Sequence, residues 1–203
     1  MTFGQRFARF VTDVVTRRPV LWSVFRRPLA RMFDSMAPTW DSSRVTPVHM
    51  APLDAALDRI GTATRILDVG TGTGAAARLL AARWPEAEVT GVDLSAAMVR
   101  EAQARGPQQY LVADASALPF ADGSFDLVTL LNAIPFYDEL ARVTAAGGTV
   151  VLAYSRGAET PIFTPFASSR AALERRGFGD FEEVAAGNGT ALLARLHSRP
   201  GAR

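Results

Sequence analysis

Short apolar runs alternate with helix-forming runs through the second and third quarters of the chain. The apolar runs predict buried strands at residues 65–69, 88–92, 109–112, 125–131 and 149–154. Segments rich in Ala, Leu and Arg between them predict helices, among them 75–83 and 96–105. Two further strands, 181–185 and 190–196, flank a glycine-rich turn and are typical of a hairpin. The alternation predicts an open, doubly wound, mostly parallel α/β sheet.

The first fifty residues show a different pattern. Apolar side chains at helical spacing predict an amphipathic helix over 3–16 that ends at Pro19. We expect a second short helix over 20–27, a break at Pro28, a third helix over 29–36, and a loop over 40–50. The next helix should end near residue 61. We therefore divide the chain into an N-terminal helical lid, residues 1–50, and a core domain, residues 51–203.

Basic charge is concentrated in this lid. Residues 1–34 carry seven Arg against Asp13 and Asp34, a net charge of +5, whereas the whole chain has a net charge of +2. Aromatic residues among arginines are compatible with an anionic membrane surface or an acidic partner. We favour a lid packed on the core, because the apolar stripe is narrow and usually faces a core. No nucleic-acid-reading motif accompanies the arginines, so we expect no nucleic-acid partner.

The composition narrows the possible chemistry. The chain has no Cys and only two His, His49 and His197, which are far apart, so we expect no metal site and no thiolate catalysis. No uninterrupted apolar run approaches the roughly 18 residues of a membrane span. The first residues lack the basic-then-apolar order of a secretory signal. We therefore expect a cytoplasmic protein of unknown oligomeric state.

A glycine loop joins the first predicted core strand to the following helix. Gly70, Gly72 and Gly74 alternate with threonines in the segment 68–74, where missing Cβ atoms let a ligand approach the backbone. The helix that follows contributes free N–H groups and a positive dipole at its start. By itself the loop also satisfies the dinucleotide fingerprint, so a nicotinamide-dependent oxidoreductase is one interpretation.

Polar residues at the next strand ends separate the two interpretations. Asp93 follows Gly74 by 19 residues, close to the spacing of a carboxylate that binds both ribose hydroxyls. Asp68 stands before the glycines, where it would repel a pyrophosphate but could hold an ammonium. Asp114 could accept a hydrogen bond from a purine amine. An ammonium, a carboxylate, a ribose and an adenine describe S-adenosylmethionine better than NAD.

Four segments in order resemble the motifs of class I S-adenosylmethionine-dependent methyltransferases, particularly the small-molecule branch of the ubiquinone and menaquinone biosynthesis methyltransferases. They lie at 66–74, 92–95, 114–120 and 124–128. The resemblance implies a Rossmann-like sheet of seven strands in the order 3-2-1-4-5-7-6, with strand 7 antiparallel. It also implies S-adenosyl-L-methionine as the cofactor and a small-molecule methyl acceptor.

The resemblance further implies a set of cofactor-binding residues. The methionine part of the cofactor would lie against the loop, the ribose on the second strand end, and the adenine between the second and third strand ends. The implied residues are Asp68, Gly70, Thr71, Gly72, Asp93, Leu94, Met98, Asp114, Ala115 and Asn132. Several of these residues could instead have a purely structural role. The aspartates can be turn residues, and Leu94 and Met98 can belong to the hydrophobic core.

The acceptor side is less defined. Trp40, His49 and Tyr137 are candidate substrate-binding residues, although aromatic packing under the lid explains the first and last equally well. Because the sulfonium is already activated, alignment and water exclusion can suffice without a catalytic residue; Tyr137, Asp138 and His49 are candidates if a base is needed. We expect methyl transfer to a moderately apolar O, N or C nucleophile. The alternatives are the oxidoreductase and a non-catalytic cofactor-binding or membrane-associated protein.

Overall fold

The core of the protein, seen in a computed structural model that describes residues 2–197, is a sheet of seven strands in the order β3-β2-β1-β4-β5-β7-β6. β7 runs antiparallel to both of its neighbours, whereas β1 is parallel to β2 and β4. The predicted fold and strand order are therefore confirmed. The strands are β1 Arg65–Val69, β2 Glu88–Asp93, β3 Gln109–Val112, β4 Phe125–Leu131, β5 Thr144–Tyr154, β6 Phe178–Ala186 and β7 Gly189–Leu196.

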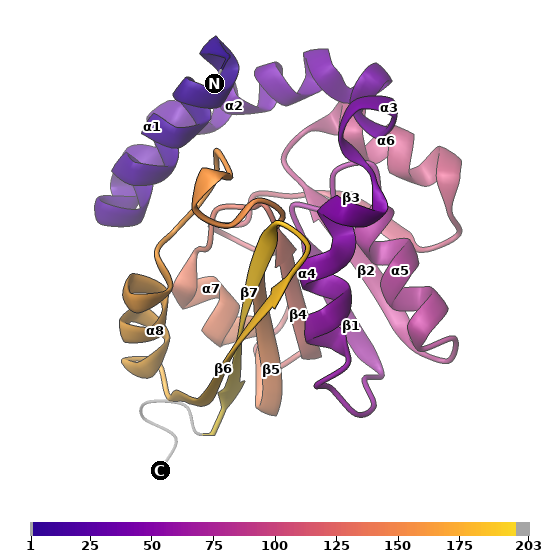
Figure 1. Ribbon diagram of the computed structural model, residues 1–203, viewed down its shortest axis with the longest axis vertical. Helices are drawn as coiled ribbons and strands as arrows, with labels where there is room; N and C mark the ends of the chain where they lie inside the picture. The colour runs from indigo at the N-terminus through magenta and orange to yellow at the C-terminus, as the bar shows by residue number, and fades with distance from the viewer. Residues whose placement is uncertain (1, 198–203) are drawn as a thin grey trace.

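Helices cover both faces of this sheet (Figure 1). α4 (Pro47–Leu57), α5 (Ala75–Arg83) and α6 (Ala96–Arg105) pack on one face, and α7 (Tyr137–Val143) and α8 (Phe166–Glu174) pack on the other. Two apolar clusters fill the space between the sheet and these two helix layers. Successive residues of β1 point into different clusters: Ile66 lies in the one beneath α4, α5 and α6, and Leu67 in the one beneath α7 and α8. Because both faces are buried, the central strands are mostly apolar and lack strict alternation, which is the signal that located them in the sequence.

The N-terminal helices lie beyond the carboxyl ends of the strands, at the top of Figure 1. Their buried side chains form a third apolar cluster together with Ile134 and Ile162, which follow β4 and β5. This cluster closes the edge of the sheet where parallel strands present a ligand. The elements of this layer are α1 Phe3–Arg17, the 3-10 helix Pro19–Leu21, α2 Trp22–Met36, the 3-10 helix Ala37–Thr39 and α3 Trp40–Arg44.

Three expectations for the N-terminal region are wrong. Pro28 does not break the chain but lies inside the continuous helix α2. Its side chain and Val24, one turn earlier, are exposed, so water can satisfy the carbonyl that proline leaves unpaired. The expected loop over 40–50 is replaced by α3 and the start of α4, and α4 ends at Leu57 rather than near residue 61. The division of the chain at residue 50 stays a prediction.

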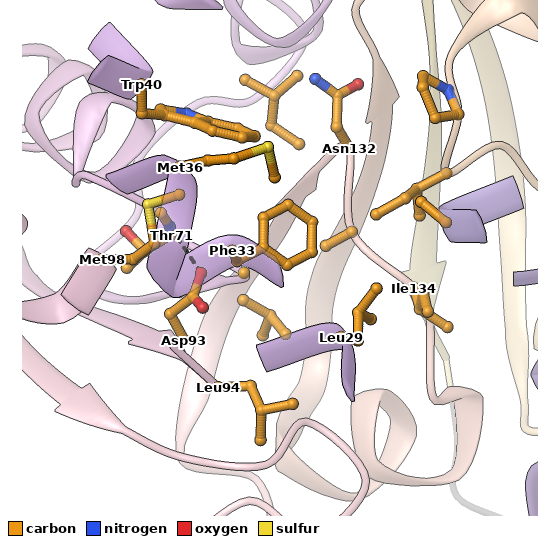
Figure 2. Close-up of a pocket in the computed structure, with 18 of the residues that line it drawn as sticks. Leu29, Phe33, Met36, Trp40, Thr71, Asp93, Leu94, Met98, Asn132 and Ile134 are labelled. Carbon is orange, nitrogen blue, oxygen red and sulfur yellow. Dashed lines mark hydrogen bonds between the residues drawn. The ribbon is translucent and has the colours of Figure 1, made fainter. Parts of the chain in front are cut away.

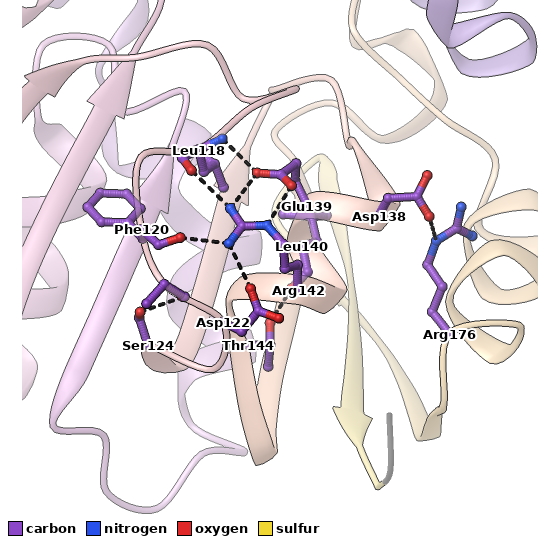
Figure 3. Close-up of polar contacts among 11 residues, drawn as sticks. Leu118, Phe120, Asp122, Ser124, Asp138, Glu139, Leu140, Arg142, Thr144 and Arg176 are labelled. Carbon is purple, nitrogen blue, oxygen red and sulfur yellow. Dashed lines mark hydrogen bonds and ion pairs between the residues drawn. The ribbon is translucent and has the colours of Figure 1, made fainter. Parts of the chain in front are cut away.

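A partly buried ion-pair network fixes the turn-rich segment between β3 and β4 (Figure 3). The guanidinium of Arg142 donates to the carbonyls of Leu118 and Phe120, at 2.9 and 2.6 Å, and pairs with Glu139. Glu139 in turn accepts a 2.6 Å hydrogen bond from the Leu118 N–H. The paired Arg142 holds the pKa of Glu139 below its usual value. The segment after β3 is thereby anchored to α7.

No helix in the described part of the chain combines the length and apolarity that a membrane crossing requires.

Candidate functional site

A cavity of about 380 Å³ lies between the carboxyl ends of the central strands and the inner faces of α1 and α2. Its volume is within the range of small-molecule sites, roughly 300 to 1,000 Å³. In Figure 2, Asp93 and Leu94 lie on one side of Phe33, and Asn132 and Ile134 lie on the other. The cavity therefore has a polar wall from the strand ends and an apolar wall from the N-terminal helices.

The glycine loop forms part of the polar wall. Gly70, Gly72 and Gly74 all have positive φ, at 73°, 54° and 81°. A Cβ on Gly70 would lie 2.6 Å from the Cβ of Ala133, so packing as well as φ requires glycine there. A Cβ on Gly72 would have the Trp40 indole nitrogen as its nearest neighbour, at a van der Waals distance of 3.7 Å. Gly72 therefore has room for a Cβ within the protein, and only its φ and a ligand in the cavity oppose one.

Asp93 is held against this loop at the end of β2. Its Oδ2 accepts a 2.9 Å hydrogen bond from the Gly72 N–H, and its Oδ1 accepts one of 2.8 Å from the Ser95 N–H. Burial raises the pKa of Asp93 above its usual value, while these two hydrogen bonds act in the opposite direction. The carboxylate borders the cavity with lone pairs left over, which suits it to two adjacent hydroxyl groups.

Asp68 lies behind the loop and not among the residues that line the cavity. Only 1% of its surface is exposed, and burial raises the pKa of its carboxyl to about 6. Thr129 donates a 3.0 Å hydrogen bond to Oδ1, whereas Oδ2 has no hydrogen-bond partner among the described residues. A nearby positive charge would stabilise this buried carboxylate, so its predicted pairing with an ammonium is chemically consistent and stays a prediction.

Asp114 is turned toward the N-terminal helices. Its carboxylate accepts hydrogen bonds from Trp22 Nε1 at 2.7 Å and Arg26 Nη1 at 3.1 Å, and from both the N–H and the hydroxyl of Ser116. Partial burial raises the pKa of Asp114, but these donors outweigh it and hold the pKa below its usual value. Asp114 does not line the cavity, whereas its neighbour Ala115 does. The predicted contact of Asp114 with an adenine amine stays a prediction.

The remaining predicted cofactor residues lie together on the cavity wall. Thr71, Leu94, Met98 and Ala115 all line it. Asn132 also lines it, in a left-handed conformation with φ of 56°.

The amide of Asn132 spans the ends of β4 and β5. Its Oδ1 accepts from the Ser155 N–H at 2.9 Å, and its Nδ2 donates to the Ser155 hydroxyl at 3.0 Å. The side chain is therefore fixed before any ligand arrives, and its amide is engaged with the protein.

Two of the three candidate substrate-binding residues line the cavity, and the third does not. Trp40 and His49 line the cavity, and Trp40 packs edge-on against Phe33 with ring centroids 5.7 Å apart. Tyr137 lies outside the cavity, where its hydroxyl hydrogen-bonds the Ser169 hydroxyl at 2.8 Å. Asp138 pairs with Arg176 at 2.8 Å, also away from the cavity. Of the three candidate bases, the structure brings only His49 to the site.

Two aspartates of the N-terminal helices attach this region to the cofactor loops, and sequence reasoning assigned them no role. Asp34 accepts from the Ser95 hydroxyl at 2.6 Å and from the Ala97 N–H at 3.1 Å, which satisfies donors at the start of α6. Asp41 accepts a short hydrogen bond from the Thr73 hydroxyl and pairs with Arg105 at 3.1 Å. No local sequence pattern signals these contacts, because the partners are 61 and 32 positions away in the chain.

The strand order, the glycine loop and the acidic residue at the end of β2 define a Rossmann-like domain for a nucleoside cofactor. Residues 66–148 match a family model described as a methyltransferase domain. The chain therefore carries a methyltransferase domain of the S-adenosylmethionine-dependent class, as its motifs predicted. No group of three potential metal ligands occurs among residues 2–197.

Named relatives agree with this assignment. A demethylmenaquinone methyltransferase of Thermus thermophilus is 41% identical over 140 residues, which make up 60% of this chain and 63% of the relative. A malonyl-acyl-carrier-protein O-methyltransferase of Halorhodospira halophila is 37% identical over 146 residues, 64% of this chain and 49% of the relative. The chain thus spans about half to two thirds of the length of these relatives.

A solved structure shows the same fold. A chain from the complex between the Haloferax volcanii Trm112 methyltransferase activator and the putative methyltransferase superimposes with a TM-score of 0.70 at 21% identity. The superposition covers 82% of this chain and 98% of that chain. At this identity the likeness concerns the arrangement of the elements and not the substrate.

Proposed function

We propose that the protein transfers the methyl group of S-adenosylmethionine to a small, moderately apolar acceptor at an oxygen, carbon or nitrogen atom. The observation that carries this proposal is the two-sided cavity. Its polar wall contains the glycine loop and Asp93, and its apolar wall contains Leu29, Met32 and Phe33. A nucleoside cofactor and an apolar acceptor would thus lie next to each other.

The residues of the polar wall fit the cofactor. Gly72 leaves space for close approach of a ligand to the backbone, and Asp93 suits the ribose hydroxyls. Thr71 lies on the same wall, next to these residues. Leu94 and Met98 present apolar surface on the same wall, which suits the adenine face. When bound, S-adenosylmethionine supplies a methyl group activated on a sulfonium.

The protein's contribution to the transfer is alignment and exclusion of water. The inner faces of α1 and α2 close the cavity over the strand ends, and the contacts of Asp34 and Asp41 hold them there. Fixing two reactants in line can contribute several kcal/mol, roughly 7 to 11 in the best intramolecular cases. If the acceptor must lose a proton, His49 is the candidate base. Its Nδ1 is 2.6 Å from the Thr46 hydroxyl, which leaves Nε2 for the acceptor.

The apolar wall supports an acceptor with a hydrocarbon or aromatic body. Met32, Phe33 and Met36 contribute flexible or aromatic side chains, which adapt to ligand shape. The relatives are named for demethylmenaquinone and for malonyl-acyl-carrier-protein, so quinol-like rings and acyl carboxylates are the first acceptors to test.

Calorimetric titration with S-adenosylhomocysteine and, separately, NADH tests the cofactor. We expect binding of the first and none of the second; the reverse result would establish the oxidoreductase alternative. Release of S-adenosylhomocysteine is then measured with a panel of quinols, phenols and carboxylic acids. Turnover with one class identifies the acceptor, whereas cofactor binding with no turnover across the panel would favour the non-catalytic alternative.

A further inference from the structure

α1 and α2 each have a second side that faces away from the core. On α1, the buried residues Ala8, Val11 and Val15 face the third apolar cluster, while Phe3 and Phe10 are 87% and 54% exposed. Phe3 and Phe10 are seven residues apart and therefore share one side of the helix, opposite the buried side. The helix thus has apolar residues on both sides, one of which is buried and the other largely exposed.

α2 repeats this arrangement. Trp22 and Leu29 are buried, whereas Val24 is 62% exposed on the opposite side, and Val20 in the preceding turn is 80% exposed. Phe10 of α1 packs edge-on against Phe25 of α2 with ring centroids 5.8 Å apart, which places the two helices side by side. We call the exposed side of this pair the outer face; it comprises Phe3, Arg6, Phe10, Arg17, Val20, Val24, Arg27 and Arg31.

Six of the seven arginines in residues 1–34 divide into two groups. Arg9 donates to the carbonyls of Ala158 and Thr160, both at 2.7 Å, and Arg26 pairs with Asp114, so these two attach the helices to the body. The four arginines of the outer face are exposed, and within residues 2–197 none of them forms an ion pair; they are Arg6, Arg17, Arg27 and Arg31. Outside this segment the chain is acidic, since a total of +2 less +5 leaves −3.

We infer that the outer face of α1 and α2 binds the surface of a lipid bilayer that contains anionic lipids. Exposed phenylalanines and valines interleaved with unpaired arginines on a helix surface match the interfacial binding mode, in which apolar side chains enter the acyl boundary and basic ones contact headgroups. A second copy of the chain is a poorer occupant, because two outer faces would bring like charges together. The inference goes beyond the proposed methyl transfer and does not depend on the acceptor.

Vesicle sedimentation with the full chain tests this inference. We expect the protein to sediment with vesicles of phosphatidylcholine mixed with phosphatidylglycerol, less so as salt is raised, and not with phosphatidylcholine alone. Absence of sedimentation with the anionic vesicles at low salt, or equal sedimentation with both kinds, would overturn the inference. An acidic protein partner would give the first of these outcomes.

Charge-matched variants separate the outer face from general basicity. The triple variant Arg6→Gln/Arg27→Gln/Arg31→Gln should weaken vesicle binding about a hundredfold, roughly fivefold per arginine. The control Arg65→Gln/Arg100→Gln/Arg175→Gln removes the same charge from exposed positions elsewhere and should bind as the parent does. An equal loss in both triples would contradict a specific face.

The apolar component needs its own variant. Phe3→Ser/Val24→Ser should reduce binding to anionic vesicles while the charge is unchanged, since less apolar surface enters the bilayer. Thermal unfolding and S-adenosylhomocysteine titration without vesicles accompany every variant. Retained folding and cofactor affinity with lost vesicle binding support the inference. Unchanged vesicle binding by this pair would show that the exposed apolar residues do not enter the membrane.

Discussion

The indole Nε1 of Trp22 lies 2.7 Å from Oδ1 of Asp114, 92 positions later in the chain. This hydrogen bond joins α2 to the end of β3, where the motif pattern predicts that a carboxylate receives the adenine amine of the cofactor. Arg26 binds the other oxygen of the same carboxylate at 3.1 Å. If the predicted role is right, the N-terminal helices and the nucleoside compete for Asp114.

Replacement of Trp22 by phenylalanine tests this competition. Phenylalanine keeps an aromatic ring near Phe136 and removes the donor together with part of the buried indole volume. We expect Trp22→Phe to tighten S-adenosylhomocysteine binding about fivefold in calorimetry and to lower the free energy of unfolding by about 1 to 2 kcal/mol, because one hydrogen bond and some buried apolar volume are lost.

The matched control is Trp84→Phe. The indole of Trp84 donates a 3.0 Å hydrogen bond to the carbonyl of Gly61, and neither residue lines the cavity. This variant should lose similar stability with no change in cofactor affinity. Equal affinity of Trp22→Phe and the parent would show that Asp114 does not exchange partners when the nucleoside binds.

Asp93 provides the second prediction. Asp93→Ala should weaken S-adenosylhomocysteine binding about a hundredfold or more, because the predicted hydrogen bonds from two ribose hydroxyls to a carboxylate are lost. The variant also loses an acceptor for the Gly72 N–H, so part of the loss would arise from the loop. Calorimetry measures the affinity, and chemical denaturation measures the change in stability.

Asp126→Ala is the control for this variant. The carboxylate of Asp126 accepts hydrogen bonds from the N–H groups of Thr64 and Arg65 at the start of β1, away from the cavity. It should destabilise the protein without changing cofactor affinity. Parent-like affinity in Asp93→Ala would mean that the ribose lies elsewhere.

Gly70 and Gly72 should respond differently to alanine. Gly72→Ala introduces a methyl group that has room in the protein, so we expect a stability loss of about 1 kcal/mol from its left-handed φ. The methyl would face the cavity and should sharply reduce cofactor binding.

Gly70→Ala should instead act mainly on stability. Its methyl would lie 2.6 Å from the Cβ of Ala133, and overpacking adds to the strain of φ, for a loss of about 3 kcal/mol. Denaturant titration combined with calorimetry separates the two variants. A Gly72→Ala protein with parent-like affinity would exclude a close approach of the cofactor to this residue.

The elements that sequence patterns located correctly are those whose signals are local. The strand 65–69 has apolar residues at Ile66, Leu67 and Val69 without strict alternation because both faces of β1 are covered, and Ser95 caps α6 as its residue type predicts. The strand order followed from the motif resemblance. Pro28 misled the prediction because Val24, one turn earlier, lies on the exposed side of the helix, where water can satisfy a carbonyl that the proline cannot.

The closure of the site depends on contacts that no local pattern encodes. Asp34 meets Ser95, Asp41 meets Thr73 and Trp22 meets Asp114, and each pair is separated by at least 32 positions. Asp34 and Asp41 are residue types that are common on exposed helix surfaces, so the sequence alone gives them no special role. Their roles appear only when the N-terminal helices are placed over the strand ends.

The raised pKa of Asp68 gives a prediction for stability. Its pKa of about 6 in the folded protein exceeds the usual 3.8, so the folded state holds a proton that the unfolded state releases between these values. The contribution of Asp68 to the free energy of unfolding is therefore complete below about pH 4. It decreases by about 3 kcal/mol in total as the pH rises toward 6. Asp68→Asn should remove this part of the pH dependence and be the more stable protein at pH 8.

The same group connects stability to cofactor binding. If the ammonium of the cofactor lies near Asp68, binding favours the charged carboxylate and releases its proton at pH 6. Calorimetry in buffers of different ionisation enthalpy measures this release, which Asp68→Asn should abolish while the Thr129 hydrogen bond retains its acceptor. Proton release that persists in the Asn variant would assign it to another group. The absence of any release in the parent would place the ammonium away from Asp68.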